Sequence, residues 1–137
     1  SLITATEQSF QIQEGSPTYL ENFARQEAAC QWLGIAGQIF DISDEPVTDS
    51  SIVVEIGGAL QGEEISHITL SGMSSGTPYG PGGYEIIVRD TPVASSGTLW
   101  IQLFTPSAGL PLSEKIYFDT YNDCERNLIL ISFVQVE

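Results

Sequence analysis

The sequence predicts an all-β protein in which two sheets pack face to face. Short apolar runs are separated by glycine and proline roughly every 10–15 residues, which is the spacing expected of strands joined by turns. Within several runs apolar and polar residues alternate, as they do along a strand with one buried face. Two cysteines stand directly ahead of two of these runs. With 137 residues, the chain is long enough for one domain with a sizeable core.

The strand pattern recurs in segments bounded by turn residues. In residues 97–104, Leu99 and Ile101 fall on one face and Trp100 on the other, so Trp100 is the better candidate for exposure. The last segment is apolar on both faces, which predicts a central strand. Residues 20–29 alone have modest helical character, and we expect a turn or one or two helical turns there. The expected strands are residues 8–13, 31–40, 51–57, 64–71, 83–89, 97–104, 115–120 and 127–136.

The two cysteines, Cys30 and Cys124, can form one internal disulfide. The alternative is a pair of reduced, buried thiols that pack as small apolar groups. Each cysteine precedes an apolar strand, so a bond between them would hold the first and last strands of the sandwich side by side and parallel. That arrangement is typical of immunoglobulin-like sandwiches. We therefore expect an immunoglobulin-like or prealbumin-like two-sheet sandwich.

The segment before the first cysteine is expected to be an extended N-terminal arm. We divide the chain into residues 1–29, an arm and connector, and residues 30–137, the β-sandwich domain. A lone β-ribbon is not stable in water, so the arm must pair with a sheet edge. It either adds a strand to its own sandwich or is donated to another copy, with Gly15-Ser16-Pro17 as the hinge. The apolar side chains expected to mediate self-assembly are Leu2, Ile3, Phe10 and Ile12.

The charge balance restricts the partners. Eighteen acidic residues face four basic ones, for a net charge of −14. Such a surface repels phosphate backbones and anionic lipids, so we expect no nucleic-acid partner. No apolar run reaches the roughly 20 residues that span a bilayer, so we expect no membrane insertion. The chain begins with Ser rather than Met and carries few lysines, and we expect a secreted, extracellular or cell-surface protein whose signal peptide has been removed.

Several motifs resemble a known family. Residues 34–41, 45–47, 51–56 and 83–86 resemble the strands of carboxypeptidase regulatory-like domains, which are also called transthyretin- or prealbumin-like. The chain departs from that pattern at Asp44-Glu45, where glycine usually precedes the proline. Residues 15–136 also resemble an uncharacterised domain of secreted proteins from environmental bacteria, through G-S-P-x-Y, C-x-W-x-G-I-A-G-Q, Y-G-P-G-G-Y-E and the C-terminal strand. The resemblance implies a fold and no chemistry.

The sequence contains no recognisable set of catalytic residues. His67 is the sole histidine, and its neighbour Ser66 points to the opposite face of an alternating strand, so the two cannot form a dyad. No pair of acidic residues lies in a sequence motif that is recognisable as the catalytic pair of a glycosidase. We expect no enzyme activity and no cofactor.

Two ligand hypotheses remain from the sequence. Asp41, Asp44 and Asp49, with Glu45, lie in one turn and are weak calcium candidates; turn chemistry is the alternative. Tyr79, Tyr84 and Trp100 are possible contacts for surface glycans or peptides.

The leading functional hypothesis from the sequence is a non-enzymatic extracellular subunit that self-assembles into a surface filament, a homopolymer built by N-terminal strand donation. The alternative is a glycan- or peptide-binding accessory module of a larger surface protein. The two differ in whether the N-terminal strand pairs in another copy or in its own.

Overall fold

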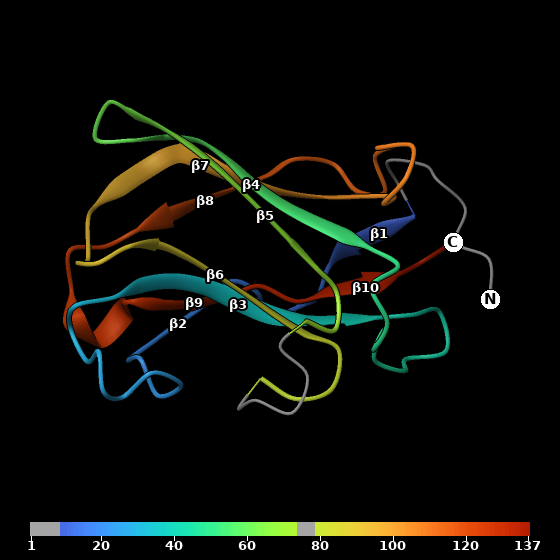
Figure 1. The fold of residues 1–137 in the computed structure, drawn as a ribbon, viewed down its shortest axis with the longest axis horizontal. Helices are drawn as coiled ribbons and strands as arrows, with labels where there is room; N and C mark the ends of the chain where they lie inside the picture. The colour runs from blue at the N-terminus through green and yellow to red at the C-terminus, as the bar shows by residue number, and fades with distance from the viewer. Residues whose placement is uncertain (1–8, 74–78) are drawn as a thin grey trace.

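The computed structural model describes residues 9–73 and 79–137, and Figure 1 shows the described chain as two stacked layers of strands. Apart from the three-residue 3-10 helix η1 (Cys124–Arg126), its regular elements are all strands. None of the helical structure in the described ranges is long and apolar enough to cross a bilayer. The strands are β1 (Phe10–Ile12), β2 (Thr18–Leu20), β3 (Leu33–Phe40), β4 (Val53–Leu60), β5 (Glu63–Leu70), β6 (Gly83–Arg89), β7 (Ser95–Phe104), β8 (Ile116–Thr120), β9 (Leu128–Leu130) and β10 (Phe133–Gln135).

The strands form two sheets. One has the order β1-β10-β3-β9-β2, with β6 paired to β3, and the other has the order β5-β4-β7-β8. This arrangement confirms the predicted all-β fold with two sheets, consistent with a sandwich. The strand order alone does not establish the immunoglobulin-like topology.

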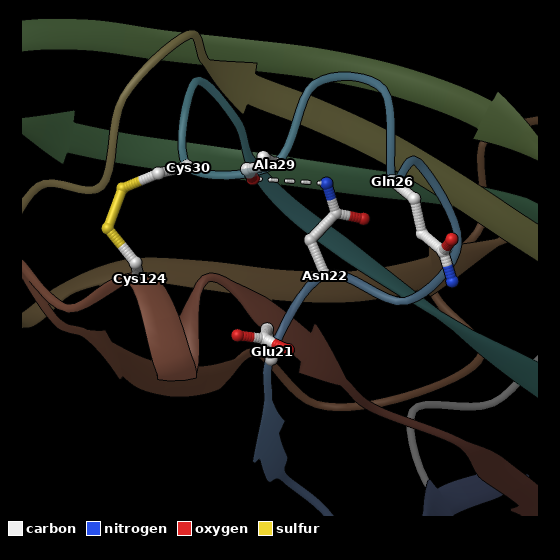
Figure 2. A pocket seen from close by; sticks show the side chains of 6 residues that line it. All are labelled: Glu21, Asn22, Gln26, Ala29, Cys30 and Cys124. Carbon is white, nitrogen blue, oxygen red and sulfur yellow. Dashed lines mark hydrogen bonds between the residues drawn. A yellow bond between two sulfur atoms is a disulfide. The ribbon is translucent and has the colours of Figure 1, made fainter.

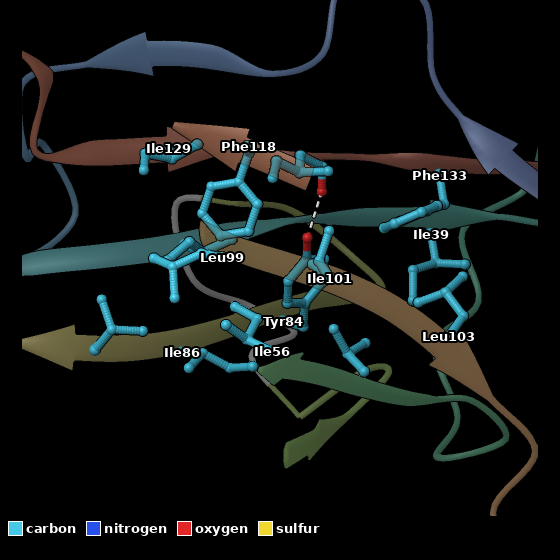
Figure 3. Close-up of a cluster of buried hydrophobic side chains, with 14 of the residues drawn as sticks. Ile39, Ile56, Tyr84, Ile86, Leu99, Ile101, Leu103, Phe118, Ile129 and Phe133 are labelled. Atoms are coloured by element: carbon cyan, nitrogen blue, oxygen red, sulfur yellow. Dashed lines mark hydrogen bonds between the residues drawn. The ribbon is translucent and has the colours of Figure 1, made fainter. Parts of the chain in front are cut away.

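The core lies between the sheets and is built from the alternating positions that the sequence indicates. Figure 3 shows side chains from both layers meeting there, with Tyr84 at the centre. Burying an aliphatic or aromatic side chain of this size contributes about 1.5–3 kcal/mol relative to leaving it exposed. Fully buried members include Leu33, Ile35, Ile39, Ile52, Ile56, Leu60, Leu99, Ile101, Leu103 and Phe133.

The disulfide between Cys30 and Cys124 is present, as predicted. It joins the chain just ahead of β3 to the start of η1, which leads into β9. β3 and β9 pair in parallel, with Gly34 opposite Leu128, so the predicted parallel neighbours are confirmed. A disulfide indicates that the chain folds in an oxidising compartment.

The N-terminal strand belongs to the sandwich of its own chain. β1 pairs antiparallel with β10, and Phe10 is 1% exposed within the main core. β2 pairs antiparallel with β9. Of the two pairings that the sequence leaves open for the arm, the described strands have the one within the same chain, since residues 10–12 and 18–20 are strands of its first sheet. Apolar burial of Phe10 between the sheets is the physical reason for this placement.

The predicted last strand is divided at Ser132. The backbone amide of Ser132 donates to Ser16 Oγ, and the Ser132 carbonyl accepts from the amide of Gln13. The bend between β1 and β2 therefore faces the break between β9 and β10. The chain is interrupted between β1 and β2 and, at the facing position, between β9 and β10. A single continuous strand over residues 127–136 therefore does not form.

The connector between β2 and β3 contains turns and no regular helix. The amides of Ala28 and Ala29 both donate to the carbonyl of Arg25, but the pattern goes no further. The connector covers part of the outer face of the first sheet through a small apolar cluster of Trp32, Ala36, Tyr79 and Leu128, against which Ala24, Ala28 and Leu130 pack.

Candidate functional site

The outer face of the β5-β4-β7-β8 sheet carries a row of four residues that share one register. Ser66 lies opposite Gly57, Gly57 opposite Trp100, and Trp100 opposite Tyr117. Cross-strand partners point to the same side of a sheet, and the neighbours Ile56, Ile101 and Phe118 point into the core. The row spans three strand spacings, or roughly 14 Å. We call these four residues the Trp100 face.

Glycine lets the indole lie against the sheet. A Cβ atom at Gly57 would overlap the Trp100 ring. The next residue, Gly58, has φ of 112°, a left-handed value that glycine tolerates best, and a Cβ there would overlap the carbonyl of Thr98. The two glycines thus allow a close approach, Gly57 to the indole and Gly58 to the backbone of Thr98.

A hollow of about 360 Å³ lies at this position. Its lining residues are one tryptophan, one serine, two glutamates, two glycines and one isoleucine. The hollow thus combines one aromatic residue with polar groups, and both kinds of group occur in ligand sites. The lining residues are Glu55, Gly57, Gly58, Glu64, Ile65, Ser66 and Trp100.

The aromatic residues of the Trp100 face differ in exposure. Trp100 is half-buried, and Tyr117 is 58% exposed. The ammonium group of Lys115 lies 4.5 Å from the centroid of the Trp100 ring, which is a cation–π contact. Lys115 approaches from the β8 side and does not line the hollow, which lies on the β4 and β5 side.

The other two tyrosines expected to contact a ligand have structural roles instead. Tyr84 is fully buried, and its hydroxyl donates to the backbone carbonyl of Ile131 across the core (Figure 3). Burial raises the pKa of that hydroxyl above its usual value. Tyr79 is buried under the connector, and its hydroxyl donates to Glu85. Neither hydroxyl is presented to a ligand, because each position faces an apolar cluster in the folded chain.

Glu85 anchors the connector to the first sheet. Arg25 donates to both carboxylate oxygens, at 2.6 and 3.1 Å, and Tyr79 donates at 2.5 Å. The Glu85 side chain is 8% exposed. Burial alone would raise the pKa of the carboxyl, but the hydrogen bonds from Arg25 and Tyr79 outweigh it and hold the pKa below its usual value. The charges of this cluster are satisfied internally.

The calcium candidates act as turn residues. Asp41 Oδ1 accepts from the amides of Ser43 and Glu45, and Asp49 Oδ1 accepts from the amide of Ser51. Asp44 has a φ of 63°, a left-handed backbone conformation that aspartate tolerates in turns. Within residues 9–73 and 79–137, no group of three or more histidine, cysteine, aspartate or glutamate side chains converges to hold a metal ion. The carboxylates of this loop therefore shape the turn.

A second hollow, of about 330 Å³, lies beside the disulfide (Figure 2). Asn22 lines it, but its side-chain amide is occupied by the carbonyls of Arg25 and Ala29, and its oxygen by the amide of Arg25. This hollow has no aromatic wall. Its lining residues are Glu21, Asn22, Gln26, Ala29, Cys30 and Cys124.

Of the four residues expected to mediate self-assembly, the structure describes only two, Phe10 and Ile12. Phe10 packs in its own core, and Ile12 packs partly against it. Leu2 and Ile3 lie outside the described residues. In this structure β1 is therefore a strand of its own subunit.

Sequence comparisons do not assign this chain to a family. No protein-family model, curated protein or solved structure matches it.

Sequence reasoning found Trp100 but missed its three partners. Alternation along 97–104 places Trp100 outward, and that part of the prediction agrees with its position. Gly57 and Gly58 carry a usable signal, since two glycines inside a β-branched strand mark a close approach of another group. Ser66 and Tyr117 join the face only through strand register, which a single sequence does not specify.

Proposed function

We propose that this chain is a non-enzymatic extracellular module that binds a carbohydrate chain on the Trp100 face. The observation that carries the proposal is the indole of Trp100, held against Gly57 at the wall of an open hollow and in register with the exposed ring of Tyr117. The disulfide agrees with an oxidising, extracellular setting.

The chemistry of the face suits a sugar. The apolar C–H surface of a pyranose ring packs on an aromatic ring, while its hydroxyls need hydrogen-bond partners at the rim. Trp100 and Tyr117 supply the rings, and Ser66, Glu55 and Glu64 supply the polar groups. A row of roughly 14 Å admits more than one sugar ring, so a linear oligosaccharide fits better than a single sugar.

Lys115 does not block this role. Its contact with the indole is an exposed cation–π interaction, worth about 0.5–1 kcal/mol, and its long side chain can move aside. A stacked sugar would replace that contact at small cost. The ammonium group would then be free to donate to a sugar hydroxyl.

A glycan array followed by titration calorimetry tests the proposal. Wild-type protein is expected to bind one class of oligosaccharide. Tyr117→Ala, which removes a largely exposed ring, and Trp100→Ala are each expected to weaken binding by about tenfold or more, equivalent to about 1.4 kcal/mol.

The matched control is Phe23→Ala, which removes an aromatic ring that is 39% exposed outside the Trp100 face. This variant should bind as wild type does. Thermal melts of all three variants separate lost contacts from lost folding. Absence of saccharide binding by the wild type, or wild-type affinity in both face variants, would overturn the proposal.

Self-assembly by strand donation, the leading hypothesis from the sequence, stays a prediction. Because β1 pairs with β10 of the same chain and buries Phe10, donation of residues 10–12 would require that β1 leave its own sheet. Light scattering and negative-stain microscopy of the purified protein test it directly. If the wild type forms filaments and a variant that lacks residues 1–13 does not, the polymer is favoured over the binding module.

A further inference from the structure

We propose that the glycan bound on the Trp100 face contains amino sugars with free, protonated amines. This inference rests on the proposed carbohydrate-binding function and names its ligand class. It follows from the charges that line the hollow beside the indole and from the groups that those charges do not contact.

Two carboxylates of the hollow have no ion-pair partner in the described part of the chain. Glu55 and Glu64 both line it, whereas Arg25, Arg89 and Arg126 each pair with a different carboxylate elsewhere. The remaining basic residue, Lys115, contacts Trp100 from the β8 side. The hollow therefore presents two uncompensated negative charges to an incoming ligand.

The two carboxylates flank the centre of the hollow. Along the paired strands β4 and β5, Gly57 lies opposite Ser66. Glu55 precedes this pair, opposite Ile68, and Glu64 lies beyond it on the other side, opposite Ala59. The indole covers Gly57, so a ligand group in the hollow lies beside the ring, with a carboxylate on each side along the strands. Two flanking carboxylates favour an ammonium group, because they attract its positive charge.

The ammonium group of Lys115 contacts the indole from the β8 side. The hollow lies toward β4 and β5, away from that lysine, so a ligand amine there does not need to displace it. A glycan rich in uronic acids would meet the two carboxylates and a net protein charge of −14, which disfavours it.

Titration calorimetry with three matched hexasaccharides tests the inference: a β-1,4-linked glucosamine oligomer, its fully N-acetylated form, and a β-1,4-linked glucose oligomer. The free-amine oligomer is expected to bind about tenfold tighter than either neutral oligomer at low salt. That preference should shrink as salt screens the carboxylates.

The double variant Glu55→Gln/Glu64→Gln is expected to remove the preference, so that the free-amine oligomer binds no tighter than the two neutral oligomers. The control, Glu14→Gln/Glu27→Gln, changes the net charge equally at two exposed positions that do not line the hollow. The control should keep the preference. An equal loss in both double variants would show a general charge effect and overturn the inference.

The remaining outcomes separate this inference from the proposed function. Equal binding of all three oligomers, lost in Tyr117→Ala, would overturn the amine preference and leave the carbohydrate proposal standing. Absence of binding to any oligosaccharide would overturn both. A lysine-rich peptide that binds as tightly as the glucosamine oligomer, with the same loss in Glu55→Gln/Glu64→Gln, would overturn the sugar class and point to a peptide ligand.

Discussion

Asn127 accepts a hydrogen bond from the backbone amide of Asn22 at 2.9 Å, although the two residues are 105 positions apart. The Asn127 side-chain amide donates to the carbonyls of Ala29 and Trp32, at 2.9 and 3.1 Å. One buried side chain thus satisfies three backbone groups of the connector. Its neighbour Asn22 closes the connector loop through the amide and carbonyl of Arg25. In the connector, hydrogen bonds from side chains therefore satisfy backbone groups that a helix would have satisfied with backbone hydrogen bonds.

Asn127→Ala is therefore expected to destabilise the fold. Loss of the side chain leaves buried backbone groups without partners, at about 1–3 kcal/mol for each unsatisfied group. We expect a loss of at least about 2 kcal/mol in the free energy of unfolding, measured by urea denaturation. Asn122→Ala, at an exposed position, should change it by less than about 0.5 kcal/mol. Equal stability of Asn127→Ala and wild type would show that water replaces the missing bonds.

The connector also shows why part of the fold escaped the sequence analysis. Its alanines favour a helix by propensity, but Asn22 and Asn127 offer the backbone other partners, so turns form. β2 was missed because Thr18–Leu20 is too short to show alternation and exists through its pairing with β9. β6, in contrast, has the bounds predicted from its sequence, since a Gly/Pro-rich loop precedes it and apolar residues alternate along it.

The site divides in the same way. Alternation suffices to turn Trp100 away from the core, because side-chain direction in a strand is a local property. Alternation also places Tyr84 on the same face as Ile86 and Val88, but it does not reveal that a second sheet covers that face. The Ser66–Gly57–Trp100–Tyr117 row depends on the register of four strands, and register is set by the whole fold.

Gly57→Ala tests the packing of the indole. The added methyl group overlaps the Trp100 ring, so either the ring moves or the strand shifts, and overpacking of this kind costs about 1–3 kcal/mol. We expect a lower midpoint in urea denaturation. In a Trp100→Ala background the same substitution should cost clearly less, because the overlapping ring is gone. Identical costs in the two backgrounds would mean that the methyl group is resisted by something other than the indole.

Phe10→Ala tests whether β1 is part of the fold in solution. Removing a fully buried phenylalanine ring costs about 3–5 kcal/mol, so the variant should unfold at a much lower urea concentration than wild type. Ile42→Ala is the control, because Ile42 is largely exposed. Deleting residues 1–13 should likewise destabilise the chain, since it leaves β10 without a partner on one edge. A deletion variant as stable as wild type would show that β1 is dispensable to its own subunit.

Removal of the disulfide should lower stability more than any single surface change. The bond links residues 94 positions apart, and the chain-entropy model gives about 4–5 kcal/mol for a loop of that length. Cys30→Ser/Cys124→Ser and the reduced wild type should therefore show similar, strongly lowered melting temperatures. Reducing agent should have no effect on the double variant. A wild type that melts at the same temperature with and without reductant, despite free thiols by titration, would contradict this expectation.

The Glu85 cluster gives the chain a pH dependence at its acid limit. Because the pKa of Glu85 is lower in the folded chain than in the unfolded one, its contribution to stability is present above the unfolded pKa, about 4.3, and is lost as the pH falls through the folded pKa. Glu85→Gln should thus be less stable than wild type at pH 7, and the difference should narrow below about pH 4. Thermal melts between pH 7 and pH 3 measure it, with the exposed Glu27→Gln as the control that shows little difference at either end. A gap for Glu85→Gln that stays constant down to pH 3 would show that the carboxylate charge contributes nothing and that Arg25 and Tyr79 hold the connector by hydrogen-bond geometry alone.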